Sequence, residues 1–145
     1  MIQIELVDSP IHLADWESSL HDVDTGAHAW FAGVTRRTTA DGSGGVQITQ
    51  TLHYEAHRPM AIDQLQQLAQ QARRQHSLTG VVIVHRLGEV SLGQASVLVG
   101  CSSPHRIDVF AALPWIMDRL KADVPIWKRE TFADDSTQWV HPDAQ

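Results

Sequence analysis

The sequence has a single cysteine, no long apolar run and fewer basic than acidic residues. Cys101 alone cannot form an internal disulfide, and one cysteine fits a reducing compartment. No apolar stretch approaches the roughly 20 residues that a membrane-spanning helix needs. The formal net charge of −6 argues against broad nucleic-acid binding, which depends on neutralising phosphates. We therefore expect a cytoplasmic protein with neither a membrane nor a nucleic acid as partner.

Length and composition are those of one globular domain. The chain has 145 residues, which can bury a sizeable core, and its 43% hydrophobic and 19% charged residues are ordinary for such a domain. Residues 1–6 alternate like a strand and lack the basic segment and apolar stretch of a signal peptide. We expect a single domain over residues 1–145, without a signal peptide.

Apolar periodicity predicts strands and helices in mixed order. The predicted strands cover residues 1–6, 27–34, a segment from Val46 on, 81–85 and 95–100, with a short strand near residues 139–140 in an otherwise irregular end. The strands at 27–34 and 81–85 are expected to be buried. Helices are predicted to start at Pro10, Pro59 and Pro104, because proline is favoured in the first helical turn. Strands that arrive in pairs between helices favour an α+β fold.

The third predicted helix has a proline in its interior. Pro114 should kink this helix. Its inward-facing residues are expected to be Phe110, Leu113, Ile116, Met117 and Leu120.

Two groups of basic residues are candidates for an anion site. His105 and Arg106 fall in the first turn of the third helix, where free N–H groups also attract anions. Lys121, Lys128 and Arg129 form the second group, and lysine can donate protons or hold anions. Both groups have a simpler explanation, since Arg106 could be a surface charge and lysines are favourable at a helix C-terminus.

Arg36 and Arg37 lie between a predicted strand and the glycine-rich loop at residues 41–45. An arginine on a strand end beside a mobile loop can form a gated pocket, although a solvated strand end explains it equally well. The loop lacks the Gly-Lys-Ser/Thr ending of a nucleotide-binding P-loop.

Other reactive residue types predict no site. The nine histidines show no ligand spacing typical of a metal site. His85 in a buried strand is interpreted as a core histidine, and Cys101 as a small apolar core residue.

Five segments together resemble one family. They are Phe-Ala-Gly-Val-Thr-Arg at 31–36, Leu-His-Tyr-Glu-Ala at 52–56 followed by Pro-Met-Ala at 59–61, His-Arg-Leu-Gly at 85–88, Ser-Ser-Pro-His-Arg at 102–106, and a lysine at 121 followed by Trp-Lys-Arg-Glu at 127–130. In this order and spacing they resemble the catalytic (large) subunits of molybdopterin synthase, the MoaE family. Pro104 departs from the small residue usual there, but the first helical turn tolerates it.

The resemblance implies an α/β-hammerhead type of fold, with a mixed or antiparallel sheet and about three helices. It implies a homodimer and a small ubiquitin-like sulfur carrier ending in a Gly-Gly thiocarboxylate. Two sulfurs would pass from that carrier to cyclic pyranopterin monophosphate to form the molybdopterin dithiolene, without a cofactor or metal. This chain ends Pro-Asp-Ala-Gln, so we expect it not to be the carrier itself.

The resemblance also implies the site. Lys121 and Lys128 are the expected catalytic residues, and Phe31 and Met117 should line the pocket. The expected substrate-binding residues are Val34, Thr35, Arg36, His105, Arg106, Lys121, Lys128, Arg129 and Glu130. Either Arg36 or Arg37 could supply the guanidinium.

The spacing on the third helix has a geometric consequence. His105 and Lys121 are 16 residues apart, which is ~24 Å along an unbroken helix. A pterin monophosphate is far shorter. We therefore expect Lys121, Lys128 and Arg36 of one subunit to share a site with His105 and Arg106 of another. Two other functions are alternatives to that of a molybdopterin synthase. One is a non-catalytic anion- or partner-binding module of the same fold, and the other is a metal hydrolase.

Overall fold

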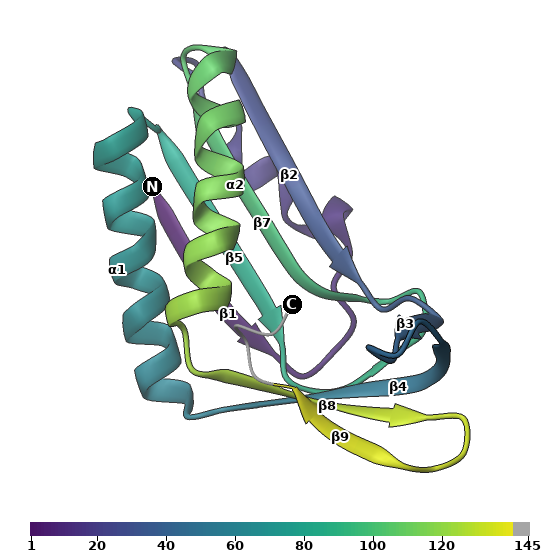
Figure 1. The fold of residues 1–145 in the computed structure, drawn as a ribbon. Helices are drawn as coiled ribbons and strands as arrows, with labels where there is room; N and C mark the ends of the chain where they lie inside the picture. The colour runs from purple at the N-terminus through teal and green to yellow at the C-terminus, as the bar shows by residue number, and fades with distance from the viewer. Residues whose placement is uncertain (141–145) are drawn as a thin grey trace.

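A four-stranded sheet with two α-helices on one face forms the larger part of the fold (Figure 1). The computed structural model describes residues 1–140. The strand order is β1 (Ile2–Val7), β5 (Gly80–Arg86), β7 (Ala95–Ser103) and β2 (Ala27–Val34). β1 runs parallel to β5, and the other pairs are antiparallel.

The helices α1 (Arg58–His76) and α2 (Arg106–Asp123) cover one face of this sheet. Leu65 of α1 and Ile116 of α2 are fully buried against Ile83 and Val99 of the strands. A smaller cluster on the other face contains Leu20, Val82, Val84 and Leu98. Because both faces are covered, β5 is a continuous buried run of β-branched residues rather than an alternating one.

A second, antiparallel sheet lies across the end of the first (Figure 1). Its order is β3 (Thr38–Ala40), β4 (Val46–Ala56), β8 (Ile126–Phe132) and β9 (Thr137–Val140), and β6 (Gly88–Ser91) also pairs with β4. β2 and β5 end next to this sheet, and α2 leads into it through β8. Segments far apart in the sequence therefore meet at the junction of the two sheets.

The predicted α+β class is confirmed, and the predicted strands are present. The number of helices differs, because the segment after Pro10 forms two 3-10 turns, Leu13–Asp15 and Glu17–Leu20, instead of an α-helix. This segment has only a few apolar anchors and includes Ser18 and Ser19, so it cannot offset the cost of helix nucleation.

Three further expectations were wrong. The strand at 27–34 is an edge strand with half-buried and exposed side chains, because only β7 pairs with it among residues 1–140. Phe110 is 66% exposed, since the face of α2 toward the core is formed by Val109, Ala112 and Ile116. The C-terminal part contains the full strand β8, which is stabilised by pairing with β4 and β9.

The start of α2 also lies later than predicted. His105 is the N-cap and Arg106 the first helical residue, because Ser103 still belongs to β7 and pairs with Ala27. The helix continues through Pro114 to Asp123. The chain end at 142–145, on which the expectation about the sulfur carrier rests, lies outside the described residues.

No helix in the described part of the chain is long and apolar enough to cross a membrane.

Candidate active site at the junction of the two sheets

Three positive side chains from different elements meet at this junction. Arg36 follows the end of β2, Lys121 lies in the last turn of α2, and Lys128 lies on β8. The charges of Lys121 and Arg36 both act on the ammonium of Lys128. We call these three residues the cationic cluster. It unites three of the residues predicted from the sequence.

Lys128 is the most perturbed residue of the cationic cluster. Burial lowers the pKa of its ammonium, and the charges of Lys121 and Arg36 lower it further. The carboxylate of Glu130 acts in the opposite direction and raises this pKa. A lysine whose pKa is lowered gives up its proton more readily than an exposed one. Lys128 is therefore suited to proton transfer.

Glu130 lies on the same face of β8 as Lys128, because side chains of a strand alternate between its two faces. Its side chain is buried, with 5% exposure. The carboxylate accepts a hydrogen bond from the hydroxyl of Thr39 on β3 at 2.6 Å, and another from the hydroxyl of Thr49 on β4. The predicted site residue Glu130 is thus close to Lys128 but hydrogen-bonded inside the protein.

An aromatic pair, the partly buried Tyr54 and the buried His85, lies next to the cationic cluster. Tyr54 on β4 is the cross-strand partner of Lys128, and its ring contacts that of His85 edge-on at 5.0 Å between centroids. Burial lowers the pKa of His85 to about 4, against the effect of its hydrogen bond to the carbonyl of Arg86. His85 is therefore neutral near pH 7, and its interpretation as a core histidine is confirmed.

Tyr54 was not among the predicted site residues. Burial raises the pKa of its phenol, against the opposing effect of the neighbouring Ser96 side chain. The signal that could have identified it is its place in the segment 52–56, where it is the one tyrosine of the chain.

The other predicted residues near the cationic cluster differ in accessibility. Thr35 is buried, and its hydroxyl has no hydrogen-bond partner among the described residues. Its backbone is fixed by bonds to Gln94 and Gly93. Val34 is 58% exposed and Phe31 is partly exposed, both on β2. Met117 is buried one turn before Lys121 on α2.

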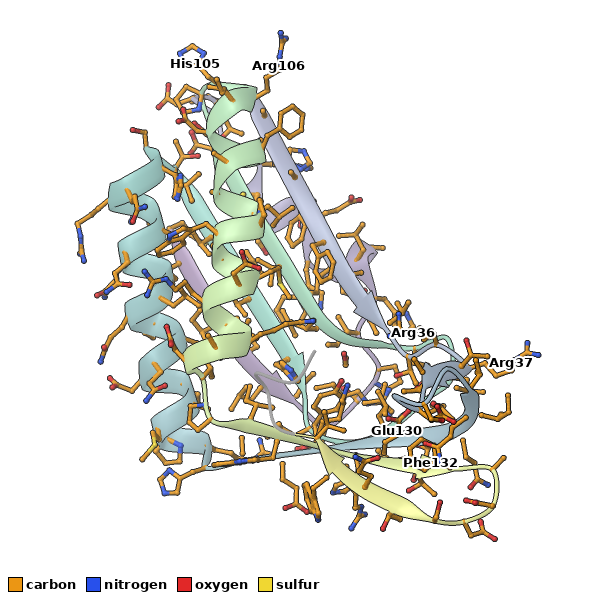
Figure 2. All side chains as sticks on the ribbon, in the orientation of Figure 1. Arg36, Arg37, His105, Arg106, Glu130 and Phe132 are labelled. Carbon is orange, nitrogen blue, oxygen red and sulfur yellow. The ribbon has the colours of Figure 1, made fainter. Side chains whose placement is uncertain are left out.

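Two basic side chains point elsewhere. Arg129 alternates to the opposite face of β8 from Lys128. Its guanidinium lies 5.6 Å from the ring centroid of Trp139. Arg37 extends outward from the edge of the molecule, away from Glu130 (Figure 2). Of the two neighbouring arginines, it is Arg36 whose charge acts on Lys128.

His105 and Arg106 lie far from the cationic cluster. Figure 2 shows them at one end of α2, with Arg36 and Glu130 toward its other end. Both side chains are exposed. From Arg106 to Lys121 the helix rises ~22 Å, so these two residues cannot reach one small ligand from the same chain.

In the described part of the chain, no three His, Cys, Asp or Glu side chains are grouped to hold a metal ion. The chemistry available at the junction is that of cations around a half-buried lysine. Fold and site together define an α+β protein with a cationic site at a strand end, suited to an anionic ligand and to proton transfer.

The comparisons with known proteins identify the family. The family model described as "MoaE protein" matches residues 6–123. A relative from Staphylococcus carnosus, named "Molybdopterin synthase catalytic subunit", is 37% identical over 97% of this chain and 89% of its own. A relative of the same name from Drosophila willistoni is 38% identical over 96% of this chain, which spans only 37% of that relative's length. The chain belongs to the MoaE family.

A solved structure supports the same assignment. The crystal structure of molybdopterin synthase from Staphylococcus aureus matches with a TM-score of 0.87 and 34% sequence identity. The match covers 97% of this chain and 98% of that chain.

Proposed function

We propose that this chain is the catalytic subunit of a molybdopterin synthase. It takes two sulfurs, one from the C-terminal Gly-Gly thiocarboxylate of each of two small ubiquitin-like carrier molecules that act in turn. It transfers them to cyclic pyranopterin monophosphate, which becomes the dithiolene of molybdopterin. The names of the family relatives support this activity. The observation that carries the proposal is the half-buried Lys128, on whose ammonium the charges of Lys121 and Arg36 both act.

The chemistry of each side chain suggests its role. The guanidiniums of Arg36 and Arg106, with the imidazole of His105, hold the cyclic phosphate and stabilise negative charge as it opens. Lys121 and Lys128 donate protons and polarise the thiocarboxylate.

Other predicted residues form the walls of the site. Phe31 and Met117 line the pocket on β2 and α2. The resemblance adds Val34 and Thr35 to the substrate-binding set, whereas Arg129 faces Trp139 and the carboxylate of Glu130 is hydrogen-bonded to Thr39 and Thr49.

We further propose that the active unit is a homodimer with shared sites. β2 and the neighbouring α2 expose four large apolar side chains, Phe31, Val34, Ile107 and Phe110, which we call the β2–α2 surface. Two of them are on α2, where Ile107 is 73% exposed. The outer edge of β2 pairs with no strand among residues 1–140, so it can pair with a second copy.

Antiparallel pairing of two β2 strands about a twofold axis would complete the site. The first residue of β2, Ala27, pairs with Ser103, and His105 follows two residues later. The last residue, Val34, leads to Arg36. A twofold axis through β2 therefore brings Arg36 of one subunit toward His105 of the partner subunit. The cationic cluster of one subunit then lies next to His105 and Arg106 of the partner subunit.

One assay tests the activity. The protein is mixed with thiocarboxylated carrier and cyclic pyranopterin monophosphate, and the dithiolene product is measured. We expect turnover in the wild type and its loss in Lys121→Ala. Substrate binding without turnover in the wild type would instead identify a non-catalytic binding module. Loss of activity on addition of a chelator would point to a metal enzyme.

A further inference from the structure

We infer that Glu130 is a positioning residue, whose carboxylate joins β3 to β4 through Thr39 and Thr49 and so fixes Arg36 beside Lys128. The inference rests on the proposed function for its kinetic consequences, but the anchoring itself can be measured without turnover. It gives Glu130 a different role from direct contact with the substrate.

The hydrogen bonds of Glu130 are the first support. A buried carboxylate is costly unless donors inside the protein satisfy it. Glu130 has two such donors, the hydroxyls of Thr39 and Thr49, and both reach the same oxygen, Oε1. The two hydroxyls are themselves 2.9 Å apart. Three strands, β3, β4 and β8, therefore meet at one carboxylate oxygen.

The path from this carboxylate to Arg36 is short. The backbone N–H of Thr49 donates to the carbonyl of Arg37 at 2.7 Å, while its side chain donates to Glu130. Thr49 thus links Glu130 directly to the residue after Arg36. The hydroxyl of Thr39 links Glu130 to β3, which follows Arg37 in the same segment.

Backbone bonds of Thr35 to Gln94 and Gly93 anchor the residue before Arg36, but the segment after Arg36 has little else to hold it. β3 is only three residues long, and among the described strands it pairs with β4 alone. The turn that follows is closed mainly by Asp41, which accepts hydrogen bonds from Ser43 and Gly45. A strand this short is marginal without side-chain anchoring. Loss of the bonds to Glu130 should therefore loosen residues 36–49.

The charge of Glu130 adds a second effect on the same site. It opposes burial and the two neighbouring cations in setting the protonation of Lys128. One carboxylate therefore both positions Arg36 and balances the positive charge of the cationic cluster.

The test removes the donors and leaves the carboxylate in place. Thr39→Val and Thr49→Val, singly and together, keep the side-chain shape but lose the hydroxyls. Thr39→Ser and Thr49→Ser keep the hydroxyls and serve as matched controls. Hydrogen exchange of the backbone amides at 36–49 is measured on the full-length protein. Steady-state kinetics with the pterin substrate are measured in parallel.

We expect the double valine variant to exchange these amides about tenfold faster and to raise KM for the pterin about tenfold, because a buried charge loses its donors. The double serine variant should restore both values. Thr39→Val alone, at a half-buried position, should show the same changes to a smaller degree and carries the test if the double variant does not fold.

Glu130→Gln separates the two effects. Its amide oxygen can still accept from the threonines, so exchange at 36–49 should stay near that of the wild type. The limb of the kcat/KM pH profile that depends on Lys128 should move to lower pH, because the charge that raises its pKa is gone.

Wild-type exchange and wild-type KM in a folded valine variant would overturn the inference, as would a large rise of KM in Glu130→Gln alone. A wild-type protein without turnover would refute the proposed function, and the exchange measurement would still decide the anchoring.

Discussion

His105 and Lys121 lie at opposite ends of α2, His105 as its N-cap and Lys121 in its last turn. The helix is continuous between them, so the two residues are ~24 Å apart along its axis. Lys121 belongs to the cationic cluster, whereas His105 and Arg106 are exposed at the far end (Figure 2). If all these residues bind one substrate, two copies of the chain must supply them.

Subunit complementation tests this sharing. Arg106→Ala and Lys121→Ala should each abolish activity, because each removes one half of every site. After mixing and subunit exchange, random pairing gives mixed dimers with one intact site, and about a quarter of wild-type activity should return. The measurement is dithiolene formation before and after exchange.

The matched control mixes Lys121→Ala with Lys128→Ala. Both residues belong to the cationic cluster of one chain, so every site in a mixed dimer lacks one lysine and no activity should return. Recovery of activity in this control would contradict shared sites. So would a lack of recovery in the mixture of Arg106→Ala with Lys121→Ala.

A charge on the β2–α2 surface should separate the subunits. We expect Phe110→Asp to give a monomer in sedimentation, because a carboxylate buried in an apolar interface is not compensated. Activity should be lost as the dimer dissociates. The circular dichroism spectrum should stay unchanged, since Phe110 is 66% exposed in a single chain. Met60→Asp on α1, also at an exposed apolar position, is the control that should remain dimeric and active. A dimeric Phe110→Asp variant would place the interface elsewhere.

Arg36 and Arg37 should differ in their effect on the pH profile. If Lys128 donates a proton, kcat/KM falls as the pH rises through its pKa. Burial and the charge of Arg36 lower that pKa, so Arg36→Gln should move the alkaline limb to higher pH and also raise KM. Arg37→Gln should leave both unchanged, because Arg37 points outward (Figure 2). The reverse result would mean that Arg37 is the arginine of the site.

The sequence predicted those parts of the fold that local patterns specify. The strand at 27–34 and the buried run in β5 follow from alternation and β-branching alone. β3 and β6 were missed because they have three and four residues and depend on pairing with β4. Phe110 was misplaced because helical spacing marks an apolar position but does not say whether a core or a second chain covers it.

The candidate site was also predicted only in part, because sequence motifs identify residues but not the contacts that their side chains make. Motif resemblance identified Arg36, Lys121 and Lys128, which the fold brings together. It could not reveal the bonds of Glu130, whose donors Thr39 and Thr49 lie 91 and 81 positions away in the sequence. Side-chain direction also required the structure, since Arg129 is adjacent to Lys128 but faces Trp139.

The buried His85 should make the stability depend on pH. Burial lowers its pKa to about 4 in the folded protein, compared with 6.5 for an ordinary solvated histidine. Between these two values the unfolded chain binds a proton that the folded chain does not, so stability falls as the pH falls from 6.5 to 4. The shift corresponds to a loss of about 3 kcal/mol at 1.36 kcal/mol per pKa unit. Urea denaturation across this range measures it.

His85→Gln should be less stable than the wild type at pH 7, because the ring contact with Tyr54 is lost. Its stability should change little between pH 6.5 and 4, since the titrating group is gone. His12→Gln, at an exposed position, should keep the wild-type slope. The lowered carboxyl pKa values of Asp41 and Asp134, caused mainly by hydrogen bonds from Ser43 and Ser136, act below this range. An unchanged slope in His85→Gln would therefore assign the acid sensitivity to a group other than His85.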